Sequence, residues 1–76
     1  MKTFNIMLDS INKVKKFVNI VSKCDYDVDL TSGRYVVDAK SIMGIFSLDL
    51  SKPIKIDIYS DEDSAFEAEI KEFIVD

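Results

Sequence analysis

The chain contains no histidine and a single cysteine, Cys24, among its 76 residues. No imidazole is therefore available as a general base, a metal ligand or a phosphoryl acceptor, and neither an intramolecular disulfide nor a Cys/His metal site can form. Asp9 and Ser10 could in principle accept a phosphoryl group, but a serine hydroxyl is a weak nucleophile without an adjacent base. We interpret the pair as a helix cap. Since a Gly-rich phosphate loop is also missing, the sequence predicts a protein that is not an enzyme and uses no cofactor.

The stretch from residue 41 to residue 48 is more informative. Ser41 is a good N-cap for a two-turn helix, and a phosphate on its hydroxyl would meet free backbone N–H groups and the positive end of the helix dipole. Ile45 and Leu48 are expected to face the core. The other apolar side chains are expected to form a docking patch on the surface: Ile42, Met43 and Phe46. The alternative, that most of these five apolar side chains belong to the core, stays open.

Alternation of apolar and polar residues predicts four strands. One covers residues 3–8, and another covers residues 54–58, where isoleucine occupies every second position. Residues 25–30 and 34–39 are typical of a hairpin around the turn residues 31–33. Carboxylates on these strands are expected on the open face of the sheet, where they are solvated and bind no metal: Asp25, Asp27, Asp29, Asp38 and Asp57.

Helical spacing of apolar residues predicts two longer helices. The first is capped at Asp9 or Ser10 and runs through Ser22, and the last follows an acidic cap at residues 60–63. Two stripes are expected to be buried: Ile11, Val14, Phe17, Val18 and Val21 in the first helix, and Phe66, Ile70, Phe73 and Ile74 in the last. The order βαββαβα indicates an α+β fold in which an antiparallel sheet carries all helices on one side.

Composition limits the class of partner. A formal net charge of -4 and a pI of about 4.6 argue against a sequence-independent nucleic-acid surface. A lysine group on the first helix is expected to form a solvated face, or alternatively to meet an acidic partner: Lys13, Lys15, Lys16 and Lys23. Apolar runs are only a few residues long, so we expect no signal peptide and no membrane span. A single domain over residues 1–76 is predicted, with Cys24 partly buried after the first helix and reduced in the cytoplasm.

One segment of the chain resembles a known family, the HPr phosphocarriers, around the regulatory serine of that family. The matching residues are Ala39-Lys40-Ser41-Ile42-Met43-Gly44, followed by Ser47-Leu48. The order of the predicted elements is also the HPr order, and the resemblance covers essentially the whole chain. It implies the HPr fold, an open-faced β-sandwich in which four antiparallel strands in the order 1-4-2-3 carry three helices on one face.

The resemblance is lost at the start of the first helix. HPr proteins have a Gly-Leu-His-Ala-Arg-Pro motif there, and its histidine carries the phosphoryl group. Counted without gaps, Ser10 falls at the histidine position, Asn12 at the arginine and Lys13 at the proline. The resemblance therefore implies the histidine-less class of the family, similar to catabolite-repression HPr-like proteins, in which the carrier function is lost.

For this class the resemblance implies a regulatory binding protein that an HPr-type serine kinase switches by phosphorylation at Ser41. Ile42, Met43 and Phe46 match the positions with which the family contacts enzyme I, the kinase and the catabolite-control repressor. Lys40 would be an electrostatic neighbour of the phosphate. The alternative is an HPr-fold interaction domain that has no phospho-switch and binds another protein. In both cases the expected partners are proteins, and neither nucleic acid nor a membrane is bound directly.

Overall fold

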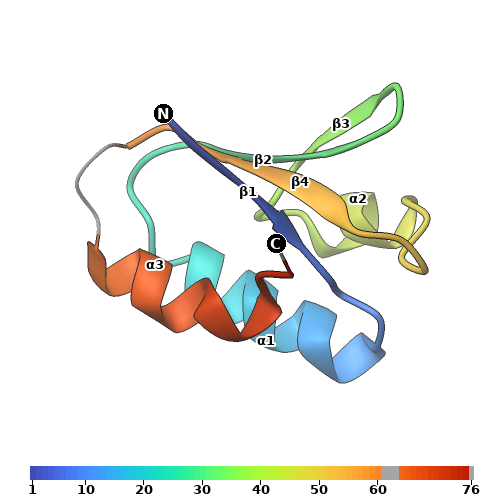
Figure 1. Ribbon diagram of the computed structural model, residues 1–76, viewed down its shortest axis with the longest axis horizontal. Coiled ribbons are helices and arrows are strands. Elements are labelled where there is room, and N and C mark those ends of the chain that lie inside the picture. The colour runs from blue at the N-terminus through green and yellow to red at the C-terminus, as the bar shows by residue number, and fades with distance from the viewer. Residues whose placement is uncertain (61–63, 76) are drawn as a thin grey trace.

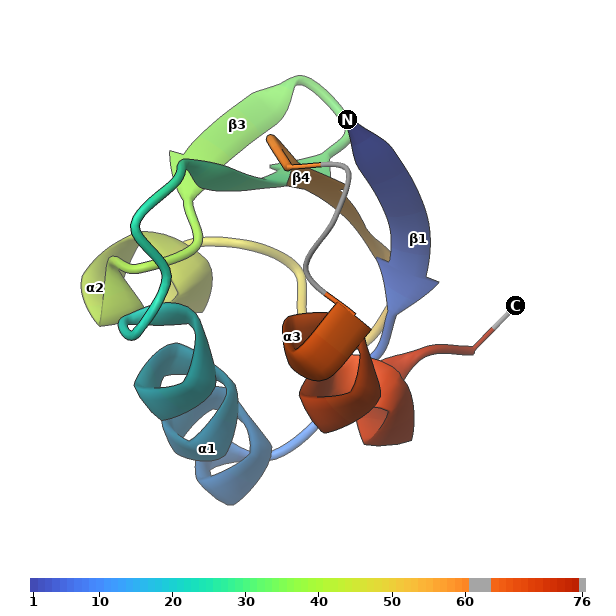
Figure 2. The ribbon, with the colours of Figure 1, turned by 90° about the vertical axis from the view of Figure 1, so that its left-hand side faces the viewer.

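Four antiparallel strands form one sheet in the order β1-β4-β2-β3, and the helices pack against one face of it (Figure 1). The computed structural model describes residues 1–60 and 64–75. The elements in chain order are β1 (Lys2–Ile6), α1 (Ile11–Val21), β2 (Val28–Ser32), β3 (Tyr35–Asp38), α2 (Ile42–Phe46), β4 (Ile54–Ile58), α3 (Ser64–Ile70) and a short 3-10 helix, η1 (Lys71–Phe73). The HPr-like α+β fold predicted from the sequence is confirmed. Figure 2 shows the layer of helices below the twisted sheet.

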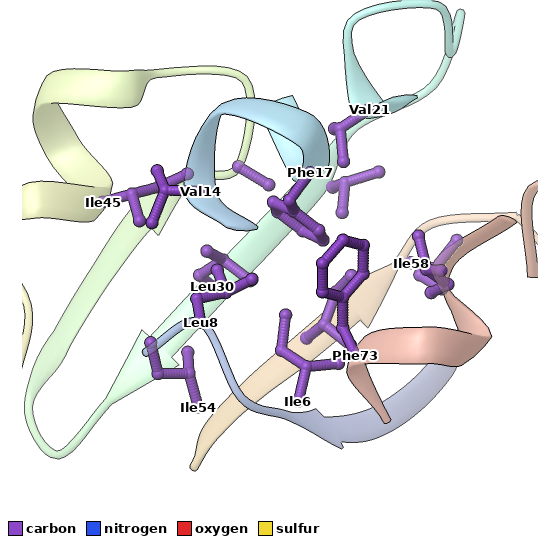
Figure 3. Close-up of a cluster of buried hydrophobic side chains, with 14 of the residues drawn as sticks. Ile6, Leu8, Val14, Phe17, Val21, Leu30, Ile45, Ile54, Ile58 and Phe73 are labelled. Carbon is purple, nitrogen blue, oxygen red and sulfur yellow. The ribbon is translucent and has the colours of Figure 1, made fainter. Parts of the chain in front are cut away.

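The core lies between the sheet and the helices and follows the predicted periodicity. On β4, Ile56 lies opposite both Phe4 of β1 and Leu30 of β2, so apolar side chains form a continuous row across three strands. From the helix side, Phe17 of α1 meets Phe73 edge to face, with ring centroids 5.7 Å apart and an interplanar angle of 89° (Figure 3). The sheet and both long helices therefore share one core.

The first helix begins as predicted but buries a narrower stripe. The Ser10 side chain accepts a hydrogen bond from the backbone N–H of Lys13 at 3.1 Å, which is the N-cap geometry. Val14, together with Phe17 and Val21, is fully buried. Ile11, in contrast, is 62% exposed, so its predicted place in the core is wrong. Side chains on a helix lean toward its N-terminus, and a residue in the first turn therefore points beyond the layer that the later turns cover.

The C-terminal segment covers the outer edge of β1. Ile74 leaves the helical stretch and forms an antiparallel bridge with Ile6, so its predicted helical position is wrong. The N–H of Val75 donates to the Asn5 carbonyl at 2.9 Å, and the N–H of Met7 donates to the Phe73 carbonyl at 2.8 Å. The remaining predicted stripe of Phe66, Ile70 and Phe73 is buried. Of the predicted acidic cap, residues 61–63 lie outside the described residues.

Carboxylates line the open face of the sheet, but one of them is not solvated. Asp29 on β2 lies opposite both Asp57 on β4 and Asp38 on β3. Asp57 is only 8% exposed, so the expectation that it is solvated is wrong. It sits on a central strand, where Thr3 Oγ1 donates to its Oδ1 at 2.9 Å and Lys55 Nζ lies 3.9 Å from the same oxygen. Thr3 of the neighbouring strand β1 and Lys55 of β4 itself therefore supply the partners that burial requires.

The β2–β3 hairpin closes through a two-residue loop. Ser32 pairs with Tyr35, so Ser32 belongs to β2 and not to the turn predicted at residues 31–33. Gly33 has φ 59, and no non-glycine residue in the described part of the chain has a positive φ. Glycine with positive φ at the first loop position is the arrangement of a type II′ turn, whose twist matches that of the paired strands.

Replacement of Gly33 by alanine should lower the free energy of unfolding by about 1 kcal/mol, because an L residue with a side chain is strained at this φ. No atom lies within 4 Å of the added Cβ, so the loss measures backbone strain without a clash. Urea unfolding followed by circular dichroism gives the value. Gly33→Asn is the matched control and should lose less, since asparagine is among the residues that favour positive φ in hairpin turns. Equal stability of the Ala variant and the unmodified protein would contradict this turn geometry.

Titration of Tyr59 tests the acidic face. The charge of Asp29, with smaller effects of burial, a hydrogen bond to Asp29 and the charges of Asp57 and Asp27, raises the pKa of the Tyr59 phenol above its ordinary value of 10.0. The folded protein therefore keeps this proton to higher pH than the unfolded chain does. The associated stability is present below pH 10 and is lost as the pH rises through the folded-state pKa. Ultraviolet difference absorbance should show an earlier Tyr59 titration in Asp29→Asn, and an unchanged midpoint would contradict this pairing.

Candidate partner-binding surface around Ser41

Ser41 caps α2 and keeps its hydroxyl at the surface. Its Oγ accepts a hydrogen bond from the backbone N–H of Gly44 at 3.2 Å, which confirms the predicted N-cap. Its own N–H donates to the Asp38 carbonyl at 3.0 Å, so the backbone before the helix is tied to the end of β3. The side chain is exposed. A modifying enzyme can therefore reach the hydroxyl without opening the core.

Gly44 lets α2 lie close to β3. A Cβ at this position would stand 3.3 Å from Val37 Cβ and 3.3 Å from Ser41 Oγ, which is tighter than ordinary van der Waals contact. The glycine lowers the intrinsic stability of the helix by up to about 1 kcal/mol. It also allows α2 to pack closely against Val37 of β3. The approach also fixes which side of α2 faces outward.

The apolar side chains of the 41–48 stretch divide into two groups. Ile45 and Leu48 are buried, as predicted, and Figure 3 shows Ile45 next to Val14 of α1. Met43 is 78% exposed and Phe46 is 42% exposed. We call these two residues the α2 patch. An exposed methionine beside an exposed aromatic ring is a surface that can adapt to a protein partner.

Ile42 lies between the two groups, because it is half-buried and packs against the core cluster. It borders the α2 patch and contributes less free surface than the sequence suggested. The exposed Ile11 adds apolar surface at the start of α1, and α1 packs against α2. Helical spacing assigned Ile11 to the core, so no signal in the sequence identified it as surface.

Lys40 has a structural partner. Its Nζ donates to the Cys24 carbonyl at 2.9 Å, and its backbone N–H donates to Asp38 Oδ1 at 2.8 Å. The side chain is half-buried. The ammonium group thus links the start of α2 to the segment after α1.

At the start of α1, Ser10 is the N-cap, as predicted, and the Asp9 carboxylate beside it is paired with a lysine. The Ser10 oxygen is used as the helix cap, and Asp9 forms an ion pair with Lys13 at 2.9 Å. A hydrogen bond from Lys13, together with its charge, lowers the pKa of the Asp9 carboxyl. Asn12 is exposed on the same turn. The arrangement stabilises the N-terminus of α1.

The structure also places the lone cysteine and the acidic side chains. Cys24 is a half-buried free thiol after α1, as predicted, and its Sγ lies 3.5 Å from the Tyr26 hydroxyl. Within residues 1–60 and 64–75, no three acidic or cysteine side chains gather in a way that could hold a metal ion. Among the same residues, no helix has the length and apolar character needed to cross a membrane.

Comparison with solved structures supports the fold. The chain is similar to HPr-C-His from Thermoanaerobacter tengcongensis, with 26% identity and a TM-score of 0.78 over 97% of this chain and 91% of that one. A phosphocarrier protein HPr from Bacillus anthracis has 24% identity and a TM-score of 0.71, with 95% and 93% of the two chains covered. The histidine-containing phosphocarrier protein of Mycoplasma has 14% identity and a TM-score of 0.71, with 93% and 86% covered. These last two likenesses show the fold alone.

Comparison of the sequence with protein families identifies the chain more directly. The model described as the PTS HPr component phosphorylation site matches residues 11–75. No curated protein matches the chain. Since the family model spans most of its length, this protein belongs to the HPr family of the phosphotransferase system, although it has no histidine.

Proposed function

We propose that this protein is a non-catalytic regulatory member of the HPr family that binds protein partners through the α2 patch and is switched by phosphorylation of Ser41. HPr proteins are carriers that work with other proteins of the phosphotransferase system. The observation that carries the proposal is a retained HPr fold with an exposed Ser41 beside exposed Met43 and Phe46, in a chain without histidine. The cytoplasm, where a lone thiol stays reduced, is the proposed location.

Loss of phosphoryl transfer follows from the residues at the start of α1. Ser10, Asn12 and Lys13 stand where the family motif has histidine, arginine and proline. The oxygen of Ser10 is engaged as a cap, and the carboxylate of Asp9 is engaged by Lys13. A phosphoserine is moreover a stable ester that does not pass its phosphoryl group on readily. A role in binding is therefore favoured over a role in transfer.

The switch is supported by the surroundings of Ser41. The Gly44 N–H, which now donates to the Ser41 hydroxyl, could donate to a phosphate oxygen instead. Phosphorylation adds a charge of about -1.5 to -2 directly beside the apolar α2 patch. A partner with a basic pocket next to an apolar groove would then bind the modified form more tightly.

The alternative is an HPr-fold interaction domain without a phospho-switch. Two observations favour it. The Lys40 ammonium group already has a partner in the Cys24 carbonyl. Asn12 replaces the arginine that the family uses in partner contacts. In this case the α2 patch would bind another protein regardless of modification.

Mass spectrometry after two separate incubations tests the proposal. We expect a single phosphate from ATP and an HPr-type serine kinase, mapped to Ser41 and absent in Ser41→Ala. We expect none from phosphoenolpyruvate and enzyme I, because no histidine is present. Labelling in neither incubation would favour the alternative without a switch. Labelling from phosphoenolpyruvate would contradict the loss of transfer and direct attention to Asp9 and Ser10.

Substitution in the α2 patch separates docking from folding. Met43→Asp should leave the free energy of unfolding within about 0.5 kcal/mol, because the side chain is exposed. Binding to a catabolite-control repressor or to the kinase should weaken by at least about 30-fold, the size of a hot-spot effect. Isothermal calorimetry and urea unfolding measure the two quantities.

Two control variants accompany Met43→Asp. Val75→Asp places the same charge on an exposed apolar residue beside β1 and should leave binding unchanged. Ile45→Ala, inside the core, should lower stability by about 2–5 kcal/mol. A similar loss of stability in Met43→Asp would show that Met43 is a packing residue, and full partner affinity would show that the α2 patch is not the docking surface.

A further inference from the structure

The outer edge of β3 is open, and two of its apolar side chains are exposed. β3 ends the sheet order, and no strand in the described part of the chain lies beyond it. On the opposite edge, the C-terminal end of β1 is covered by the segment that contains Ile74 and Val75. Tyr35 is 71% exposed and Val36 is 62% exposed. An uncovered strand edge with apolar side chains is a template for pairing with another strand.

The register decides which backbone groups face outward from β3. The N–H of Ala39 donates to the Val28 carbonyl at 2.9 Å, so the backbone of Ala39 faces β2. Backbone direction alternates along an antiparallel strand, which turns Tyr35 and Val37 toward β2 as well. The N–H and C=O of Val36 therefore point to the open side. A strand that pairs there would be hydrogen-bonded through Val36.

The sequence of this edge is complementary to itself. Residues 34–38 read Arg-Tyr-Val-Val-Asp, with opposite charges two positions on either side of Val36. In an antiparallel pair of two such strands centred on Val36, the Arg34 of each copy, which is the loop residue directly before β3, comes beside the Asp38 of the other. The two Val36 residues face each other and exchange both backbone hydrogen bonds. Tyr35 lies opposite Val37, an aromatic and β-branched pair that is favourable across strands.

We propose that two copies of this chain associate through β3, antiparallel about a twofold axis at Val36, and join their sheets into one continuous sheet of twice the number of strands. A twofold interface uses the same surface on both copies, and a self-complementary strand provides that surface. The partner of this edge is thus a second copy of the chain. The proposal is independent of the switch at Ser41.

Charge on the open face adds a reason for this partner. Asp38, Asp29 and Asp57 lie in one row across three adjacent strands, and like charges directly opposite each other are destabilising. Within residues 1–60 and 64–75, no carboxylate forms an ion pair with Arg34. Pairing would bring the Arg34 of the second copy to Asp38, at the outer end of the row. It would relieve the repulsion on both copies at once.

The interface is one short strand from each copy, well below the size of a standard stable interface. We therefore expect a weak dimer, with a Kd between roughly 10 µM and 1 mM at low salt. Added salt should weaken it, because two exposed charge pairs contribute. Sedimentation velocity from 10 µM to 1 mM should show the average mass rising from 8.7 kDa toward twice that value.

Charge exchange makes the test specific. Arg34→Glu and Asp38→Lys should each weaken self-association at least tenfold, because like charges then face each other across the axis. A 1:1 mixture of the two variants should associate as strongly as the unmodified chain, and so should the double variant Arg34→Glu/Asp38→Lys. Lys15→Glu on α1 makes the same charge change as Arg34→Glu away from the edge and should change nothing.

Folding is checked separately, because Asp38 Oδ1 accepts a hydrogen bond from the Lys40 N–H and its loss can lower stability. Circular dichroism is recorded for every variant. If Asp38→Lys does not fold, Val36→Lys replaces it, since a lysine at the centre of the edge should also abolish pairing. A chain that is monomeric up to 1 mM would overturn the proposal and leave the edge to another protein. A dimer that survives Arg34→Glu and Val36→Lys would place the contact elsewhere.

Discussion

Burial of the isoleucine face of β4 is the interaction on which the other elements depend. Ile54, Ile56 and Ile58 are almost completely buried, and β4 pairs with β1 on one side and β2 on the other. The last strand of the chain therefore joins β1 and β2, which are distant from it in the sequence. Without the helices, the apolar face of the sheet would be exposed to water, which is why the helices cover it. The edge-to-face contact of Phe17 with Phe73 packs α1 against η1 over this face.

The surface around Ser41 is a consequence of the same packing. Ile45 and Leu48 anchor the short helix α2 to the core, and Gly44 lets it lie against Val37 on β3. With one side fixed in this way, Met43 and Phe46 must face solvent. A helix of five residues would not be stable by itself, so its position and the exposure of its side chains are set by tertiary contacts. The packing thus leaves an exposed apolar patch beside Ser41.

The fold of the family is kept in a chain that has no histidine. The start of α1 shows how: Ser10 supplies the N-cap that the helix needs, so the helix forms without a histidine. The fold depends on caps and buried stripes, and neither of these needs a histidine. Function in such a case has to be argued from the site and not from the fold. Here the site that remains is a serine beside an apolar patch.

The sequence by itself determined the strands, the two caps at Ser10 and Ser41, and the order of the elements, because these depend on periodicity and on hydrogen bonds within one turn. Only the tertiary structure decided which members of these patterns are exposed. Ile11 fits the helical stripe but lies beyond the covered layer, whereas Asp57 fits an open face but is enclosed by neighbouring strands. The partner of Lys40 and the uncovered edge of β3 likewise depend on segments far away in the chain. Local patterns fix the direction of a side chain relative to its own element, while exposure depends on what the rest of the chain places in front of it.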